Sequence, residues 1–195
     1  MIIYYSDKYK GGREESRRLL EKAFAVHTGD EKRAGMLVSA LKKGEYGKPY
    51  IEGFSFFSVS HTGNMWAVLI TDRECGLDIQ FGKKSDMNAI ASRWYAPQDA
   101  AEIAALSAEE NYSAAYDSFF RIWTRREALT KAIGSTVYDS DLPAVRKGEA
   151  DISGRHYTIT DVLFPDMLIS GKPDLYAAAC IEGDGEYPEI SFITL

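Results

Sequence analysis

Residues 120–134 of the chain read FRIWTRREALTKAIG, and they close a longer helical pattern. On a helix, Trp123, Glu127 and Lys131 stack on one face, because residues four apart are neighbours. The large apolar surface of Trp123 belongs in a core and draws this face toward the interior. The glycine that closes the pattern is a typical C-terminal stop. The pattern therefore predicts a long helix over residues 112–134 that carries an acid and an amine on its inner face.

The spacing of Glu127 and Lys131 has two interpretations. An exposed pair of this kind is an ordinary surface feature worth only about 0.3–0.5 kcal/mol, and the spacing by itself favours that interpretation. The neighbouring Trp123 argues for the other one, in which the face turns inward. A carboxylate and an ammonium drawn toward an interior need partners there, such as a metal ion and a phosphate.

Strand patterns stand on both sides of the helical part of the chain. Apolar alternation and turn signals predict strands over residues 1–6, 54–60, 65–71, 76–80, 152–161, 163–169 and 175–181. Helical spacing predicts helices over residues 13–26, 86–95, 98–106 and 112–134. Residues 27–43 are polar and weakly patterned, and residues 44–50 are rich in turn signals. Strands, then helices, then strands again favour an α+β fold over a parallel doubly wound sheet.

The composition excludes several classes of protein. The chain has 195 residues, of which 45% are hydrophobic, so it can build a core and is not mainly disordered. The 23 basic and 29 acidic residues leave a net charge of -6, which gives no reason to expect a nucleic acid partner. There is no apolar run near the ~20 residues that span a bilayer, and no signal-peptide pattern. We therefore expect a soluble, cytoplasmic protein with no membrane partner, in which Cys75 and Cys180 are buried and unpaired.

Two further segments carry polar side chains in arrangements that suit binding of a metal ion or a phosphate. Asp78 and Gln80 lie two apart on a predicted strand, so their oxygens point the same way and suit a hard cation such as Mg²⁺. A solvated strand face is the simpler interpretation of that pair. Lys48, Ser60 and His61 lie near turns, where they could converge on a phosphate through charge-assisted hydrogen bonds. A Ser–His hydrolase dyad is discounted, because the chain has no GxSxG elbow.

Four motifs in a fixed order carry a family resemblance. They are Gly47-Lys48-Pro49, Phe57-Ser58-Val59-Ser60-His61, Gly76-Leu77-Asp78-Ile79-Gln80 and the stretch from Trp123 to Gly134. This order resembles the 4′-phosphopantetheinyl transferases, in particular their larger, pseudo-dimeric class, the type that activates surfactin synthetase. The resemblance implies a holo-acyl-carrier-protein synthase that moves phosphopantetheine from coenzyme A to a serine of an apo acyl or peptidyl carrier protein. It also implies Mg²⁺ as cofactor and 3′,5′-ADP as the released product.

The resemblance assigns roles to the acidic residues and to one lysine. Asp78 and Glu127 match the family's metal carboxylates, and Gln80 stands where the family often has a further acid. An amide oxygen still ligates Mg²⁺ but adds no negative charge, so we expect Asp78, Gln80 and Glu127 to bind the metal more weakly. Glu127, or a water on the metal, is the base for the carrier serine. Lys131 matches the lysine that contacts the phosphates and assists the leaving group, so the catalytic set is Asp78, Glu127 and Lys131.

The resemblance also assigns the residues that bind the coenzyme. Lys48, Ser60 and His61 match positions that hold coenzyme A, chiefly its 3′-phosphate and adenine end. Arg17 matches another phosphate-binding position.

The implied architecture has two similar α/β halves related by a pseudo-twofold. Residues 1–74 form the half that binds coenzyme A, and residues 75–195 form the half with the metal site and the catalytic helix. A monomer is expected, because one chain holds both halves. A non-catalytic module that binds coenzyme A or a carrier protein is the alternative, and a metal-dependent phosphohydrolase is a weaker one.

Overall fold

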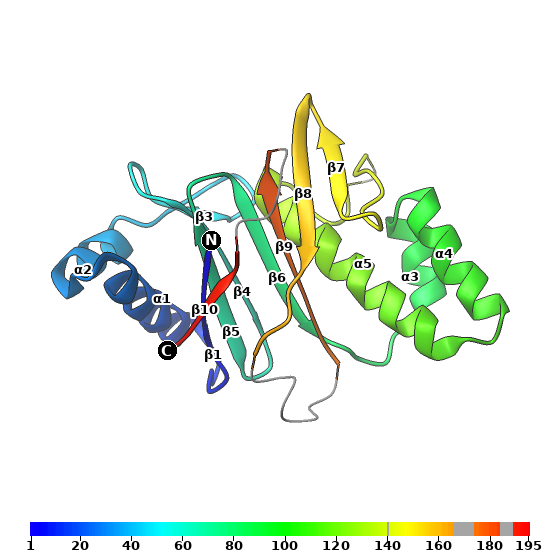
Figure 1. Cartoon of the computed structure of the whole chain (residues 1–195), viewed down its shortest axis with the longest axis horizontal. Helices are drawn as coiled ribbons and strands as arrows, with labels where there is room; N and C mark the ends of the chain where they lie inside the picture. Colours follow the sequence, from blue (N-terminus) through cyan, green and yellow to red (C-terminus); the bar gives the residue numbers. More distant parts are fainter. Residues whose placement is uncertain (140, 166–173, 184–188) are drawn as a thin grey trace.

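The computed structural model describes residues 1–139, 141–165, 174–183 and 189–195, which fold into layers of helix, sheet, sheet and helix (Figure 1). Helices α1 and α2 cover the outer face of one sheet, and α3, α4 and α5 lie on the side of the other. Their bounds are α1 (Arg13–Thr28), α2 (Glu31–Ser39), α3 (Met87–Trp94), α4 (Pro97–Ala108) and α5 (Tyr112–Ile133). None of the helices in these described ranges is long and apolar enough to cross a membrane.

The first sheet has the strand order β10-β1-β5-β4. Its strands are β1 (Ile2–Ser6), β4 (Phe56–Thr62), β5 (Met65–Thr71) and β10 (Ser191–Thr194). β1 runs parallel to β10 and antiparallel to β5, and β4 and β5 form an antiparallel hairpin. Every residue of β5 is buried, because its Val68 face packs under α1 and its Leu69 face packs toward the second sheet.

The second sheet is antiparallel and has the order β6-β9-β8-β7. Its strands are β6 (Cys75–Phe81), β7 (Glu149–Ile152), β8 (Arg155–Asp161) and β9 (Leu175–Glu182). Helix α5 approaches β6 at Gly76, where a Cβ atom would lie 1.8 Å from the carbonyl oxygen of Ala128 and 2.7 Å from the nitrogen of Ala132. Both are backbone atoms of α5, so the absence of a side chain at Gly76 is what permits this contact.

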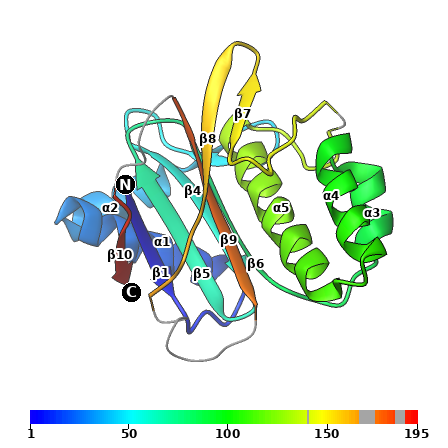
Figure 2. The ribbon, with the colours of Figure 1, turned by 45° about the vertical axis from the view of Figure 1, so that its right-hand side comes forward.

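Strands β4 and β6 lie side by side although they belong to different sheets (Figure 2). Side-chain hydroxyls of β4 accept hydrogen bonds from backbone N–H groups of β6 at every second residue. The pairs are Leu77 to Ser58 (3.0 Å), Ile79 to Ser60 (3.1 Å) and Phe81 to Thr62 (3.3 Å). Because side chains two apart share a face of a strand, three hydroxyls of β4 satisfy polar groups along the edge of β6.

A short two-stranded hairpin precedes β4 in the chain and forms a sheet of its own. It consists of β2 (Lys42–Lys43) and β3 (Pro49–Tyr50), and Lys42 pairs with Tyr50 while Lys43 pairs with Pro49. This hairpin lies in the part of the sequence that is rich in turn signals.

The mixed α and β composition predicted from the sequence is confirmed, with each predicted helix present within a few residues of its expected bounds. The expected division near residue 75 falls between the two sheets. Residues 191–194 belong to the expected second half and were not predicted as a strand, yet they form β10, which pairs with β1 of the first sheet. The parallel pairing of Ser191 with Ile2 joins residues from opposite ends of the sequence, which local patterns do not reveal.

Two sequence-based assignments are wrong. Residues 31–39, interpreted as weakly patterned, form α2, whose first turn is capped when the Asp30 carboxylate accepts a hydrogen bond from the Arg33 N–H (3.0 Å). The strand predicted over residues 152–161 contains all of β8 but starts too early, and β7, the first strand of the same hairpin, was not predicted. Ser153 and Gly154 both have positive φ and form the turn of this hairpin.

The strand predicted over residues 163–169 is not present in its described part. Residues 163–165 lie outside any strand, and residues 166–169 lie outside the described residues.

Candidate active site

Asp78 lies on β6 beneath α5, and 9% of its side chain is exposed. The Lys131 ammonium donates to Asp78 Oδ1 at 2.7 Å, and to Ser60 Oγ and the Leu77 carbonyl oxygen at 3.1 Å each. Ser60 Oγ in turn donates to Asp78 Oδ1 at 2.9 Å and accepts from the Ile79 N–H. An ammonium has three donors, and all three have acceptors here. Lys131 is therefore fixed over β6.

Glu127 lies one helical turn before Lys131 on the same face of α5 and is half-buried. Within the described part of the chain, no hydrogen bond or ion pair reaches its carboxylate. Burial raises the pKa of Glu127 above its ordinary value, the negative charge of Asp78 raises it further, and Lys131 opposes both effects. The site thus contains one acid that forms an ion pair with a lysine and a second acid whose carboxylate has no hydrogen bond or ion pair among the described residues.

These two acids and Gln80 are the residues of the site that could hold a divalent cation. Gln80 donates its side-chain N–H to the Phe81 carbonyl oxygen at 2.7 Å, which leaves its amide oxygen as the ligand atom. Among the described residues, no group of three His, Cys, Asp or Glu side chains could hold a metal by itself. Mg²⁺ commonly takes one or two carboxylates and completes its shell with substrate phosphates and water. The carboxylate of Glu127 next to Asp78 therefore suits Mg²⁺.

A cavity of about 660 Å³ opens at the N-terminus of α1. We call it the basic pocket, and the basic side chains that line it are those of Arg13, Arg17, Lys42, Lys43 and His61. Helix α1 begins at the pocket without a side-chain cap, so its first N–H groups keep their donor capacity. A helix N-terminus and several cations both favour a bound anion. The pocket therefore suits a ligand that carries phosphate groups, in spite of the negative net charge of the chain.

The structure brings two of the four predicted coenzyme residues to the basic pocket. Arg17 and His61 both line it, and the exposed His61 ring packs against the Tyr9 ring with centroids 5.2 Å apart. Ser60 faces the acidic residues instead, where it contacts Asp78 and Lys131. Lys48 does not line the pocket, because its ammonium pairs with an acid on the other side of the hairpin.

Three basic residues of the pocket were not predicted as site residues. Lys42 and Lys43 form a basic doublet just before the turn-rich segment, and Arg13 opens the first helical pattern. The basic doublet and the start of the helix can both be recognised in the sequence. The sequence alone does not place them together, because the fold of the intervening helices decides which of these cations meet.

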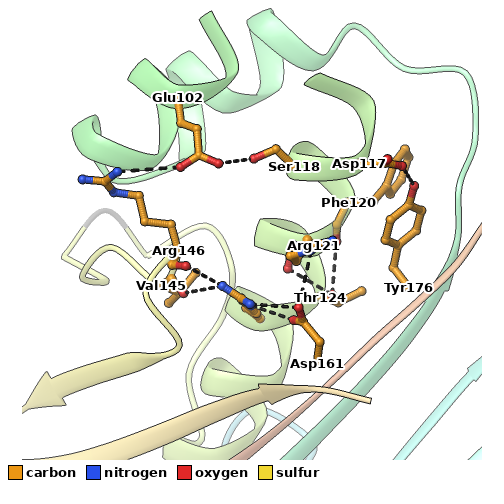
Figure 3. A network of polar contacts seen from close by, with 11 residues as sticks. Glu102, Asp117, Ser118, Phe120, Arg121, Thr124, Val145, Arg146, Asp161 and Tyr176 are labelled. Atoms are coloured by element: carbon orange, nitrogen blue, oxygen red, sulfur yellow. Dashed lines mark hydrogen bonds and ion pairs between the residues drawn. The ribbon is translucent and has the colours of Figure 1, made fainter. Parts of the chain in front are cut away.

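A separate set of contacts attaches α5 to the second sheet (Figure 3). Arg125 holds Asp161 of β8 through two hydrogen bonds, Nε to Oδ1 at 2.7 Å and Nη2 to Oδ2 at 2.9 Å. In the sheet register, Asp161 lies opposite Ala178, and Ala178 lies opposite Asp78. The two aspartates therefore occupy one row on the face under α5. The helix is tied to both ends of this row, through Arg125 and through Lys131.

The arginine next to Glu127 turns away from the acids. Arg126 is 2% exposed, donates from Nη2 to the carbonyl oxygens of Val137 and Asp139 at 3.2 Å, and lies over the Tyr95 ring at 5.9 Å. Its Nε and Nη1 atoms have no hydrogen-bond partner among the residues that the structure describes. Arg126 therefore contributes to the packing of α5 rather than to the acidic part of the site.

Comparisons with known proteins find similarity in the part of the chain that contains β6 and α5. The family model described as the 4′-phosphopantetheinyl transferase superfamily matches residues 74–160. The 4′-phosphopantetheinyl transferase AcpT of Salmonella typhimurium is 34% identical over 110 residues, which cover 52% of this chain and 55% of that protein. The 4′-phosphopantetheinyl transferase gsp of Aneurinibacillus migulanus is 29% identical over 98 residues, 50% of this chain and 39% of that protein. The chain spans about half the length of the curated relatives it matches.

The family match divides the predicted site residues into two groups. Asp78, Gln80, Glu127 and Lys131 lie inside residues 74–160, whereas Arg17, Lys48, Ser60 and His61 precede them. The segment that builds β6, α5 and their acidic side chains therefore matches the model of the 4′-phosphopantetheinyl transferase superfamily, and about half of the chain is similar to proteins that carry this name.

Proposed function

We propose that the protein transfers 4′-phosphopantetheine from coenzyme A to a serine of an apo acyl or peptidyl carrier protein. The serine oxygen forms a bond to the phosphorus next to pantetheine, and the bond from this phosphorus to the bridging oxygen breaks. The serine proton passes to a carboxylate, and 3′,5′-ADP leaves with the electron pair of the broken bond. No oxidant or reductant is needed, so atoms and charges balance within the two substrates and the base.

The observation that carries the proposal is the unpartnered carboxylate of Glu127 beside Asp78 and Lys131. A base needs a free acceptor oxygen, and among the described residues no hydrogen bond or ion pair reaches the carboxylate of Glu127. Lys131 brings positive charge to the same face of α5, and 28% of its side chain is exposed. A phosphate oxygen of the leaving group would replace the Leu77 carbonyl oxygen as one of its acceptors.

The basic pocket supports coenzyme A as the donor substrate. Its arginine and lysine side chains and the open N-terminus of α1 suit the phosphates of the 3′,5′-ADP part. Asp78 and Glu127, with the oxygen of Gln80, would hold Mg²⁺. When bound, Mg²⁺ supplies positive charge that screens the pyrophosphate from the incoming oxygen.

The pseudo-twofold relation is part of the same proposal. In the first sheet, β1 lies next to β5, which lies next to β4. In the second sheet, β6 lies next to β9, which lies next to β8. The order of strands along the chain is the same in both triplets, and a long helix packs on each sheet. One chain supplies both triplets, so we propose that the protein acts as a monomer.

The test is to incubate the protein with coenzyme A, MgCl₂ and an apo carrier protein and to measure the mass of the carrier. We expect the carrier to gain the mass of one phosphopantetheine group and 3′,5′-ADP to accumulate in equal amount. Binding of coenzyme A without a gain in carrier mass would support the non-catalytic module. Breakdown of coenzyme A without a modified carrier would support the phosphohydrolase.

Two matched variants make the assay specific for the base. Glu127→Gln keeps the size of the side chain but removes the proton acceptor, so we expect carrier modification to fall at least about 100-fold, the scale of general base catalysis. Glu109→Gln changes an exposed acid at the end of α4, away from the site, and should leave the rate unchanged. A Glu127→Gln variant as active as the parent protein would refute the role given to this residue.

A further inference from the structure

Tyr9 lies between the two elements that supply the basic pocket with anion-binding groups. One element is β4, whose end carries His61, and the other is α1, whose uncapped N-terminus and Arg13 open onto the pocket. Tyr9 lines the pocket from the segment that joins β1 to α1, and it is only 5% exposed. Because a tyrosine is uncharged at neutral pH, its contribution to the pocket comes through its contacts.

Two contacts connect Tyr9 to the hairpin of β4 and β5. The Tyr9 ring packs against the His61 ring with centroids 5.2 Å apart and planes at 45°, and the Tyr9 backbone N–H donates to the Asn64 carbonyl oxygen at 2.9 Å. The side-chain amide of Asn64 donates in return to the Asp7 carbonyl oxygen at 2.6 Å, so the segment is held against the turn of the hairpin. The ring of an exposed histidine has several rotamers open to it. The buried Tyr9 ring restricts that choice for His61.

A third contact connects Tyr9 to the start of α1. Its hydroxyl donates to the Gly12 carbonyl oxygen at 3.1 Å, and the same oxygen accepts the Ser16 N–H in the first hydrogen bond of the helix. Gly11 and Gly12 have φ values of 95° and 93°, a backbone region that favours glycine, so the chain can turn sharply from Tyr9 into α1. Tyr9 thereby fixes the direction in which the open N–H groups of the helix point.

We propose that Tyr9 is a positioning residue that orients His61 and the N-terminus of α1 toward one bound phosphate group, the 3′-phosphate of the coenzyme. The inference rests on the proposed function, in which the basic pocket holds the 3′,5′-ADP part of coenzyme A. Donors from separate elements bind a phosphate more tightly when they are already fixed before it arrives, because ordering them during binding costs free energy. Tyr9 contacts both elements, so it keeps them in one arrangement in the free protein.

A direct contact between Tyr9 and the adenine ring predicts a different result. If the Tyr9 ring stacks on the adenine, its removal weakens the binding of every adenine nucleotide alike. If Tyr9 positions the phosphate-binding groups, its removal weakens the binding of nucleotides that carry a 3′-phosphate. Since 3′,5′-ADP and 5′-AMP differ by this one group, the ratio of their affinities separates the two roles.

The experiment measures the affinities for 3′,5′-ADP and 5′-AMP by calorimetry, together with KM for coenzyme A and kcat in the carrier assay. We expect Tyr9→Leu to lower the preference for 3′,5′-ADP over 5′-AMP by about tenfold, the upper scale of a contact between two aromatic rings. KM for coenzyme A should rise by a similar factor, and kcat should change by less than about twofold. Tyr9→Phe keeps the ring and loses only the hydrogen bond to Gly12, so its preference should stay within about threefold of the parent value.

A double-mutant cycle tests whether Tyr9 acts through His61. His61→Gln removes the ring that Tyr9 orients, so adding Tyr9→Leu to it should lower the preference by less than about threefold more. An equal tenfold loss with and without His61 would overturn the positioning role. Equal losses of affinity for 3′,5′-ADP and 5′-AMP in Tyr9→Leu would overturn it as well, and would support direct contact with the adenine.

Tyr95→Leu is the matched control. Tyr95 is also a buried tyrosine whose ring stacks on another ring, that of Phe119, and whose hydroxyl donates to a backbone carbonyl oxygen at 3.0 Å, but it lies in the core beside α5 and outside the pocket. Its loss should lower the unfolding free energy and leave the preference for 3′,5′-ADP unchanged. If Tyr95→Leu lowered the preference as much as Tyr9→Leu, the effect would come from lost stability and the positioning role would be wrong.

A milder variant tests the proposal if Tyr9→Leu does not fold, as judged by circular dichroism. Asn64→Ala removes an exposed side chain and with it only the hydrogen bond to the Asp7 carbonyl oxygen, so the segment that carries Tyr9 is loosened without a cavity in the core. We expect the preference for 3′,5′-ADP to fall by about two- to threefold, the scale of one hydrogen bond. An unchanged preference in Asn64→Ala would then overturn the proposal.

The role of Tyr9 and the proposed function fail in different ways. A parent protein that modifies no carrier but prefers 3′,5′-ADP to 5′-AMP would refute the transferase activity, and the Tyr9 variants then decide the role of Tyr9 from nucleotide binding alone. A parent protein that modifies the carrier but binds both nucleotides equally well would support the activity and overturn the role of Tyr9.

Discussion

Replacing Gly76 by alanine should separate α5 from β6. A Cβ atom at this position would lie 1.8 Å from the Ala128 carbonyl oxygen, 2.8 Å from the Ala128 carbonyl carbon and 2.7 Å from the Ala132 nitrogen. All three are backbone atoms of one helix. No rotation of a side chain relieves these contacts, so the helix or the strand has to move.

The size of the displacement follows from ordinary contact distances. Nonbonded carbon atoms rest at roughly 3.5–4 Å, so the helix would have to retreat by on the order of 1.5–2 Å. Lys131 and Asp78 are held at 2.7 Å across this interface, and a shift of that size breaks their ion pair. Overpacking of a core costs typically about 1–3 kcal/mol, and occasionally more. Because the clash is with backbone, we expect Gly76→Ala to lose about 3 kcal/mol or more of unfolding free energy.

The measurement is urea unfolding followed by far-ultraviolet circular dichroism, together with the carrier assay. A misplacement near 1 Å at a reacting centre can cost about 100-fold in rate, so carrier modification should fall at least that far wherever the variant is still folded. Gly35→Ala is the control, because a Cβ there meets the flexible end of Glu21 at 3.3 Å and the position is helical. It should be neutral or stabilising by about 0.5–1 kcal/mol. A Gly76→Ala protein as stable as the parent would refute this account of the contact between helix and strand.

Further outcomes follow from individual contacts. Asp161→Asn should lower the unfolding free energy by about 1–2 kcal/mol, because it weakens two hydrogen bonds to the charged guanidinium of Arg125. Arg121→Gln should cost less than about 0.5 kcal/mol, because the ion pair of Arg121 with Asp161 is longer and more exposed. Equal losses of unfolding free energy in the two variants, measured by urea unfolding, would contradict this ranking. Burial lowers the pKa of His27 below its ordinary 6.5, so the unfolded chain binds more protons as pH falls through 6.5, and stability should drop there. His27→Gln should flatten that part of the plot of Tm against pH, and an unchanged profile would show that His27 is not responsible. Arg13→Gln should weaken 3′,5′-ADP binding by about tenfold and reduce its dependence on salt, while Lys147→Gln should change neither, with both measured by calorimetry.

Local patterns in the sequence predicted the elements on which the site is built. The helical spacing of Trp123, Glu127 and Lys131 correctly indicated one face of a long helix, and that face turns toward β6. The two-residue spacing of Asp78 and Gln80 correctly placed them on one strand. The resemblance to 4′-phosphopantetheinyl transferases is confirmed by the comparisons, and the chemical roles of the individual residues stay predictions.

Patterns also failed in identifiable places. Helix α2 was missed because its apolar residues are few, and its cap at Asp30 is a weak signal without the helix behind it. The pairing of β10 with β1 was missed because it depends on two segments from opposite ends of the sequence. The strand predicted for β8 started too early, at Ile152, because Ser153 of the turn adopts positive φ, which a serine seldom does; β7 itself was not predicted.

The sequence by itself determined which side of its own helix or strand each side chain occupies, because the periods of 3.6 and 2 are fixed by local backbone geometry. What stands opposite each face was decided by the tertiary structure. Ser60 faces Asp78 rather than the basic pocket, and Lys48 pairs with Glu74 rather than lining that pocket. The physical reason is that an ion pair or a cavity depends on distances between elements that are remote in sequence, and those distances are set by how the whole core packs.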